Sequence, residues 1–186
     1  MMKRVLFLII VLIIFGACAK QSELTIYNDT GQSIRVILDN TIHQLYPNDP
    51  PAVETYYLNS FILFGETVDA PIIIEGQIYL EHKEFVMKMK PNKDRWYHVE
   101  LDRAGLQVSN VSLFPLSTIQ LRAEGDEEWS DNILTEILYT ETMSPTISII
   151  PDYDYIKMID IFDTEYQEEI IELNAGETAT FIFFGS

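Results

Sequence analysis

The chain has 186 residues and a formal net charge of −17, and 47% of its residues are hydrophobic. Nucleic-acid binding is dominated by contacts with phosphate groups, so a chain this acidic is excluded from that function class. Disordered chains combine high charge with low hydrophobicity, and only the charge is present here. The chain is therefore expected to fold, and its length can supply one medium hydrophobic core or two small ones.

The first 18 residues have the order of a secretion signal. Residues 1–4 carry two cations, Val5–Phe15 is an apolar run, and Gly16-Ala17 precedes Cys18. An apolar run of this length is too short to span a bilayer as a helix, which needs about 20 residues. We therefore predict a signal peptide over residues 1–17.

Cys18 is the only cysteine of the chain, and it directly follows two small residues. This arrangement resembles the lipobox of bacterial lipoproteins, although Phe15 stands where that family usually has Leu. The resemblance implies cleavage between Ala17 and Cys18 and acylation of the new terminal cysteine by palmitate-type chains, which would anchor the protein in a membrane. It also implies a place in the cell envelope, facing the periplasm or the cell surface. The alternative is an ordinary cleaved signal peptide with an incidental cysteine.

The rest of the chain is predicted to be all-β, after a lipidated polar tether over residues 18–23. Short segments rich in β-branched and aromatic residues alternate in polarity, and turn residues such as Asn, Asp, Gly and Pro separate them. Within Arg95–Leu101, for example, Trp96 and His98 are expected on one face of a strand. Only Asp126–Leu138 has helical potential, and it fits a turn or a short strand as well. The expected strands are 24–28, Ser33–Leu38, Val53–Leu58, Ile72–Glu75, Ile78–Leu80, Glu84–Met89, Arg95–Leu101, 108–110, Ser117–Arg122, Thr146–Ile150, Tyr153–Ile159, Tyr166–Leu173 and Thr178–Phe184.

An internal repeat divides this part of the chain. A shift of 82 residues places Asn28 on Asn110 and Asn92 on Asn174. Units of about 80 residues suit small β-sandwiches. We predict two tandem sandwiches over residues 24–102 and 108–186, with one larger sandwich or jelly roll as the alternative.

The second unit carries several motifs in a typical order. They are Asn110, Thr118–Leu121, Trp129–Leu134, Tyr153–Asp160 and Gly176-Glu177 before Phe181. The set resembles a small immunoglobulin-like or transthyretin-like β-sandwich domain of uncharacterised secreted bacterial lipoproteins. Ser130 replaces the usual Gly, and Met143–Thr146 stands where that family has a Pro-Gly turn. The resemblance covers residues 108–186 and implies a fold and a secreted location, but no biochemical activity.

Catalytic motifs are missing from the sequence. No nucleophile elbow or Ser-x-x-Lys motif occurs, and His43, His82 and His98 are scattered without metal-ligand spacing. We therefore expect no cofactor and no enzymatic activity. The alternative is an envelope hydrolase or glycan-processing enzyme that uses Asp126 and Asp131. Such a pair would have to face each other across a cleft at roughly 5–9 Å.

Two further features are candidate ligand sites. Trp129 lies in an acidic loop beside Asp131, where an exposed indole could bind a sugar or peptide; packing of the loop over the sandwich is the competing role. Asp126, Asp131, Asp152 and Asp154 are weak candidates for calcium ligands, because their spacing matches no standard calcium loop and a solvated acidic rim explains them equally. No other metal site is expected.

Together these observations predict a lipid-anchored cell-envelope protein with a non-enzymatic role in binding, assembly or adhesion. Its expected partners are the membrane, through the lipid anchor, and an envelope protein or glycan.

Overall fold

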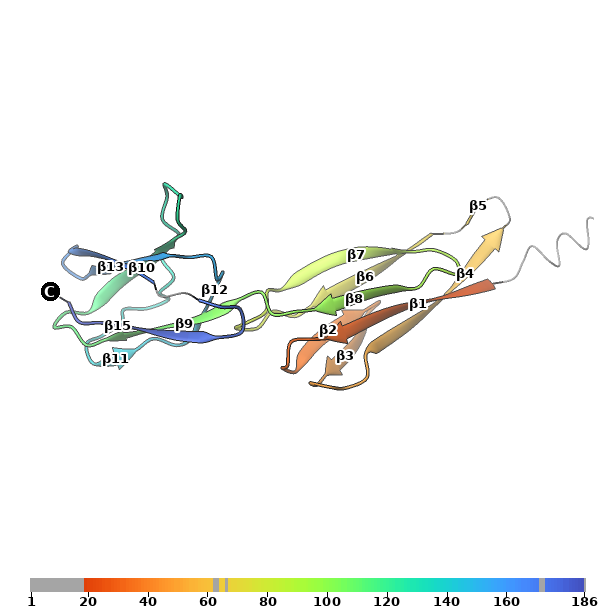
Figure 1. The fold of residues 1–186 in the computed structure, drawn as a ribbon, viewed down its shortest axis with the longest axis horizontal. Helices are drawn as coiled ribbons and strands as arrows, with labels where there is room; N and C mark the ends of the chain where they lie inside the picture. Colours follow the sequence, from red (N-terminus) through yellow and green to blue (C-terminus); the bar gives the residue numbers. More distant parts are fainter. Residues whose placement is uncertain (1–18, 62–63, 66, 171–172, 186) are drawn as a thin grey trace, which may run out of the picture. The chain divides into compact units, whose positions relative to one another are not determined.

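The computed structural model describes residues 19–61, 64–65, 67–170 and 173–185 (Figure 1). The predicted signal peptide, its cleavage site and Cys18 lie outside these residues. Within the described ranges, no helix has the length and hydropathy needed to cross a membrane.

The described residues form strands and loops only, which confirms the all-β prediction. In the first half of the chain the strands are β1 (Ala19–Asn28), β2 (Ile34–Leu38), β3 (Thr41–Leu45), β4 (Ala52–Phe61), β5 (Phe64–Gly65), β6 (Val68–Ile74), β7 (Lys83–Met89) and β8 (Arg95–Val99). In the second half they are β9 (Ala104–Asn110), β10 (Leu116–Arg122), β11 (Thr142–Met143), β12 (Ile147–Ile149), β13 (Tyr155–Asp160), β14 (Glu165–Glu169) and β15 (Thr178–Phe183).

The strands belong to two compact units, each with two sheets. The first unit comprises the described residues up to Glu75 together with His82–Glu100, and its sheets have the orders β5-β4-β1-β8 and β3-β2-β6-β7. The second comprises Gly76–Glu81 and the residues from Leu101 onward. Its sheets are β10-β13-β14 and a sheet in which β9 pairs with β11 and β12 on one side and with β15 on the other.

Both units share one topology, so the predicted pair of small sandwiches is confirmed. The opening strand of each unit runs parallel to the last strand and antiparallel to the strand on its other side (Figure 1). In each unit, alternate residues of the facing strands point inward and form an apolar core. In the second unit this core includes Leu106, Val108, Ile119, Ile156 and Phe183.

The register of the strands refines the repeat. Leu24 pairs with Arg95 in the first unit, and the matching Leu106 pairs with Ala179 in the second. The shift is therefore 82 residues at the opening strand and 84 at the last one. Because the period of a strand is two residues, this slip keeps every side chain on its predicted face.

The same slip changes which turn residues correspond. The positive φ of Asn92, 54°, is matched by that of Gly176, 85°, and not by Asn174. Each residue precedes the closing hydrogen bond of its turn, from Lys93 N to Lys90 O and from Glu177 N to Asn174 O. The sequence alignment of Asn92 with Asn174 was therefore two residues out.

Three segments differ from the expected organisation. β1 already begins at Ala19, within the predicted tether, because the inward-facing Ser22 is small and its hydroxyl donates to the carbonyl of Lys90 at 2.6 Å. β9 begins at Ala104, before the predicted start of the second unit at 108, and its first residues are buried. Gly76–Glu81, where a strand is expected at Ile78–Leu80, instead forms a turn that belongs to the second unit.

Asp126–Leu138, the candidate helix, is an irregular segment beside β10. The amides of Ser130 and Ile133 donate to carbonyls of β10 at 2.8 and 2.9 Å. The side chain of Asn132 accepts from the amides of Ile119 and Leu134, both at 3.0 Å. These bonds to a neighbouring strand replace the ones a helix would make within itself.

Candidate functional site

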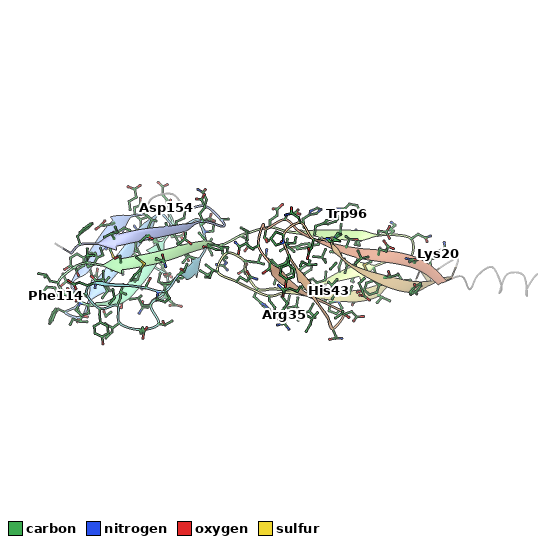
Figure 2. The ribbon with its side chains drawn as sticks, turned by 90° about the horizontal axis from the view of Figure 1, so that it is seen from below. Lys20, Arg35, His43, Trp96, Phe114 and Asp154 are labelled. Carbon is green, nitrogen blue, oxygen red and sulfur yellow. The ribbon has the colours of Figure 1, made fainter. Side chains whose placement is uncertain are left out.

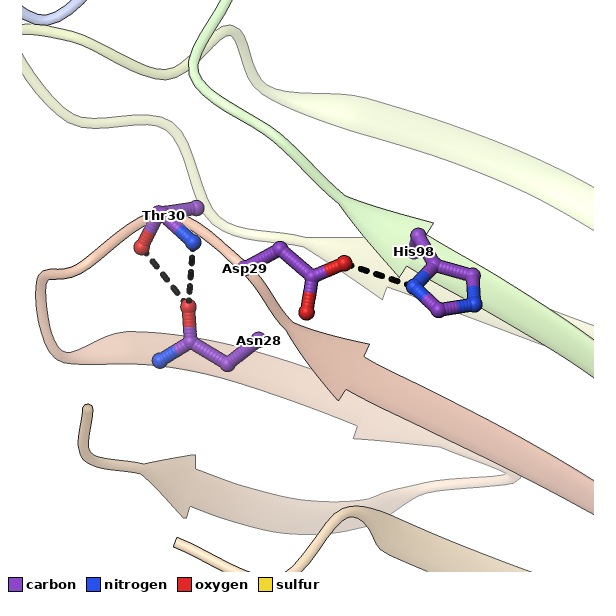
Figure 3. Close-up of polar contacts among 4 residues, drawn as sticks. All are labelled: Asn28, Asp29, Thr30 and His98. Carbon is purple, nitrogen blue, oxygen red and sulfur yellow. Dashed lines mark hydrogen bonds and ion pairs between the residues drawn. The ribbon is translucent and has the colours of Figure 1, made fainter. Parts of the chain in front are cut away.

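A hydrogen-bonded asparagine closes the opening strand of each unit (Figure 3). In the first unit, Asn28 Nδ2 donates to the carbonyls of Gln32 and Leu45, at 2.7 and 3.0 Å. Its Oδ1 accepts from the amide and the hydroxyl of Thr30, at 3.1 and 2.7 Å. The side chain thereby ties the end of β1 to the following turn and to β3.

Asn110 makes the same set of bonds in the second unit. Its Nδ2 donates to the carbonyls of Phe114 and Leu138, both at 3.0 Å. Its Oδ1 accepts from the amide and the hydroxyl of Ser112, at 3.0 and 2.7 Å. The two turns therefore have one hydrogen-bonding scheme, and Gln32 corresponds to Phe114.

The outward side chains of these two turns differ in kind. The first unit presents Gly31 and Gln32, whereas the second presents Leu113 and Phe114 at the matching positions. After the last strand, Glu100 of the first unit corresponds to Phe184 of the second, given the 84-residue shift there. The hydrogen-bonding scheme thus does not require apolar side chains, yet the second unit carries them.

These side chains form what we call the aromatic surface of the second unit. Phe114, labelled in Figure 2, points outward near the end of β9, and its ring meets the edge of the Phe162 ring at a centroid distance of 5.2 Å. The four residues of the surface are Leu113, Phe114, Phe162 and Phe184, which are 87, 45, 66 and 72% exposed. Contiguous exposed apolar groups on a small domain mark interaction sites.

The same exchange affects a neighbouring pair. In the first unit, Asp29 Oδ2 lies 2.6 Å from His98 Nδ1, and the His98 ring stacks on Tyr27 (Figure 3). The matching positions of the second unit are Val111 and Ile182, which are both exposed. A polar pair has therefore been replaced by two apolar side chains next to the aromatic surface in sequence.

A buried carboxylate lies beside the aromatic surface. Asp160, the last residue of β13, is 2% exposed. Its Oδ1 accepts from the amides of Phe162 and Thr164, at 2.8 and 3.0 Å, and its Oδ2 lies 3.5 Å from the Tyr166 hydroxyl. Burial raises the pKa of Asp160, but the donors from Thr164, Phe162 and Tyr166 outweigh it and bring the pKa below its ordinary value of 3.8. The carboxylate is therefore ionised at neutral pH.

Asp160 lines a small hollow, which we call the Asp160 hollow. Its volume is about 110 Å³. Two members of the aromatic surface's rim, Phe114 and Phe184, stand at this hollow, and Tyr166 and the buried Phe183 contact each other edge to face at 4.9 Å. The remaining lining residues are Ser112, Leu113 and Gly185. The arrangement offers one negative charge in a largely apolar setting.

A larger groove of about 430 Å³ lies between the segment 133–139 and the segment 142–147. In the first unit β3 pairs with β2 over five residues. In the second unit the corresponding segment forms a single bridge between Leu116 and Leu138, supplemented by amide bonds from the preceding loop. The groove results from this looser edge.

Trp129 covers the outer face of the second sheet of its unit. It is partly buried, and the Arg122 guanidinium and the Lys157 ammonium lie 4.7 and 4.9 Å from its ring centroid. Two cations over one indole stabilise the position of the loop. Asp131 is exposed in this loop and lines neither the Asp160 hollow nor the groove.

The four calcium candidates are not brought into one cluster. Asp154 Oδ2 accepts from the amide of Glu124 at 2.6 Å and so closes the acidic loop. Asp126, Asp131 and Asp152 are exposed, and neither hollow described above contains any of them. Across the part of the chain that is described, no three Asp, Glu, His or Cys side chains could hold a metal ion together.

The three histidines lie on separate elements. His43 is in β3, His82 contacts Glu84 at 3.1 Å before and within β7, and His98 is in β8. Trp96 and His98 are exposed on the outer face of the first sheet, with Val99 buried on the inner face (Figure 2). This alternation agrees with the predicted faces of the strand.

Charge is distributed unequally between the two halves of the chain. Residues 101–186 contain 17 acidic and 3 basic side chains, a formal charge of −14. All three cations are engaged within their unit, since Arg122 and Lys157 lie over Trp129 and Arg103 pairs with Glu81. The aromatic surface therefore belongs to a strongly anionic unit.

Sequence reasoning missed the aromatic surface and the Asp160 hollow. The missed residues stand in turns, where single apolar residues are common and carry little information. The available signal was the repeat itself, because the 82-residue shift aligns Gly31 and Gln32 with Leu113 and Phe114.

The fold and this site define an all-β chain of two small sandwiches, the second of which carries an exposed aromatic surface. No family model matches the chain, and no curated protein matches it. Among solved structures it is similar to the TIE protein of Bacillus anthracis, at 8% identity and a TM-score of 0.32, over 89% of this chain and 34% of that one. The chain thus spans about a third of the length of that protein.

Two further solved structures are similar over most of their length. One is GBS52, the minor pilin of Streptococcus agalactiae, at 10% identity and a TM-score of 0.29, over 88% of this chain and 94% of that one. The other is a DUF3823 family protein of Bacteroides ovatus, at 12% identity and a TM-score of 0.26, over 81% and 97%. Since all three TM-scores lie below 0.5, we draw no functional conclusion from them.

Proposed function

We propose that this chain is a lipid-anchored cell-envelope protein that binds a partner protein through the aromatic surface, in a non-enzymatic role in assembly or adhesion. The observation that carries the binding role is the comparison between its own two units. The same hydrogen-bonded turn is polar in one unit and apolar in the other, so folding alone does not account for Leu113, Phe114 and Phe184.

The proposed anchor rests on the opening segment and on charge. Cleavage after residue 17 would remove two cations and leave 10 basic and 29 acidic residues, a formal charge of −19. Anionic lipid headgroups repel such a protein, so membrane attachment requires acyl chains on Cys18. β1 begins at Ala19, so the proposed lipid would sit at the very start of the first sandwich.

The binding role is tested by photo-crosslinking in intact cells. A photoreactive phenylalanine analogue is introduced at position 162 or 184, and at position 57 as the matched control. Tyr57 is as exposed as these residues but lies on β4 of the first unit. Protein adducts from positions 162 and 184 that are absent from position 57 are expected. Equal adducts from all three positions, or none, would contradict the role of the aromatic surface.

The anchor is tested separately. Cells that produce the wild-type chain or Cys18→Ala are labelled with a palmitate analogue, and label is expected on the wild-type chain alone. An unlabelled wild-type chain would refute lipid anchoring and leave the crosslinking result untouched.

A further inference from the structure

We propose that the Asp160 hollow receives a lysine side chain of the partner protein. This inference rests on the proposed binding role of the aromatic surface and specifies the chemistry that this surface recognises. It combines a buried carboxylate, an aromatic rim and a surrounding unit of one charge sign.

The carboxylate supplies a binding point for one ammonium group. Asp160 is 2% exposed and lines the hollow, so its charge is shielded from bulk water. Oδ1 is occupied by two amide donors, whereas the contact of Oδ2 with the Tyr166 hydroxyl, at 3.5 Å, is at the outer limit of hydrogen bonding. Oδ2 can therefore accept a further, charge-assisted bond, which is stronger than a neutral one.

The walls of the hollow suit an alkyl stem. Phe114, Phe183 and Phe184 present aromatic carbon along its sides, and Leu113 adds aliphatic carbon at the rim. A lysine carries four methylene groups that pack against such walls while the ammonium reaches the carboxylate. Ring faces near the ammonium add cation–π attraction. The volume of about 110 Å³ admits one slender side chain and little more.

The geometry favours lysine over other cations. Arginine binds carboxylates best as a planar fork to two oxygens, and here one oxygen is already occupied. An ethanolamine headgroup places a phosphate two carbons from its ammonium, and that phosphate would meet a unit of formal charge −14. A second copy of this chain would bring the same negative charge against the surface, so self-association is disfavoured as well. A lysine on a partner with cationic surroundings fits each of these constraints.

The direct test uses defined probes on the full mature chain, followed by nuclear magnetic resonance. The probe is Nα-acetyl-lysine N-methylamide, and the comparison probes are its Nε-acetylated form, the arginine analogue and phosphoethanolamine. Weak binding of the lysine probe is expected, with shifts confined to residues around the Asp160 hollow. Shifts of the same size with the Nε-acetylated form, or tighter binding of the arginine analogue or phosphoethanolamine, would overturn the proposal.

Two variants separate the buried carboxylate from general charge. Asp160→Asn keeps an oxygen for the amides of Phe162 and Thr164 but removes the charge, and we expect it to weaken binding of the lysine probe roughly tenfold or more. Asp163→Asn makes the same change at an exposed carboxylate three residues on, and it should leave binding unchanged. Equal effects of the two variants would refute a specific site.

A further variant covers the case in which Asp160→Asn disturbs the fold. Phe184 is 72% exposed, so Phe184→Ser removes one wall of the hollow without opening the core. Several-fold weaker binding of the lysine probe is expected, and unchanged binding would overturn the proposal. Crosslinking from position 162 does not require Asp160. Adducts that persist while the lysine probe fails would therefore refute the hollow and leave the proposed function standing.

Discussion

At the scale of single residues, two asparagines hold the turns from which the candidate site is built. Each uses all of its amide capacity, with two bonds donated and two accepted. The sequence indicated that both positions were equivalent, through the 82-residue shift. It did not indicate why Asn is needed, because the two carbonyls that Asn110 satisfies come from segments 4 and 28 residues away.

Asn110→Ala is expected to lower the free energy of unfolding by about 2–4 kcal/mol, since it removes four bonds and leaves two carbonyls without their donor. Urea denaturation followed by fluorescence measures the change. The matched control is Asn174→Ala, because Asn174 makes one exposed contact with Glu177. That control should change stability by no more than about 0.5 kcal/mol. Equal losses from the two variants would show that the hydrogen-bonded turn is dispensable.

Asp160 gives this region a defined pH dependence. Its pKa is lower in the folded chain than the ordinary 3.8, because the amide and hydroxyl donors outweigh the effect of burial. A group with a lowered native pKa stabilises the fold fully above its unfolded pKa and loses that effect as the pH falls through the native pKa. We expect the Asp160 carboxyl resonance to titrate below 3.8. The stability difference between wild type and Asp160→Asn should shrink as the pH falls below that value. A midpoint above 3.8 would contradict this account.

At the scale of elements, alternation of polarity identified most strands but not those with polar or interrupted faces. β3 (Thr41–Leu45) was missed because its five residues include one buried position, Leu45. The start of β1 was taken for a tether because only the small Ser22 faces inward there. The edge strand of the second unit is broken at Ser144, whose hydroxyl accepts from the amide of Val108. In each case a contact with a distant strand determines the structure, and local sequence does not contain it.

Gly105 marks the tightest packing between elements in the second unit. A Cβ atom there would lie 2.7 Å from Thr178 Oγ1, 2.8 Å from Thr146 Cγ2 and 3.2 Å from the Tyr79 ring. Gly105→Ala is therefore expected to cost about 1–3 kcal/mol of stability through overpacking. The measurement is a thermal or urea transition of the variant.

Ser148, the partner of Gly105 on β12, provides the matched control. Its side chain is exposed, so Ser148→Ala should be neutral within about 0.5 kcal/mol. A neutral Gly105→Ala would mean that the three side chains around this position move apart freely.

At the scale of the whole molecule, one topology has been used twice with different surfaces. The repeat made the two sandwiches predictable from sequence, since a fixed shift carries the same strand pattern. The difference between the units was equally present in the sequence, as Gln32 against Phe114 and Glu100 against Phe184. It could not be interpreted there, because only the paired strands show that these positions correspond.

The two units together thus provide their own replacement experiment. Leu113→Ser, Phe114→Gln and Phe184→Glu combined give the aromatic surface the polar character of the first unit. Since the first unit maintains the same hydrogen-bonded turn with polar side chains, the triple variant should remain folded and lose no more than about 1 kcal/mol of stability. Crosslinking from position 162 in intact cells should then disappear, because the apolar contact area is gone. A triple variant that folds normally and still forms the wild-type adducts would show that the partner is held elsewhere. One that unfolds would show that these side chains serve the core after all.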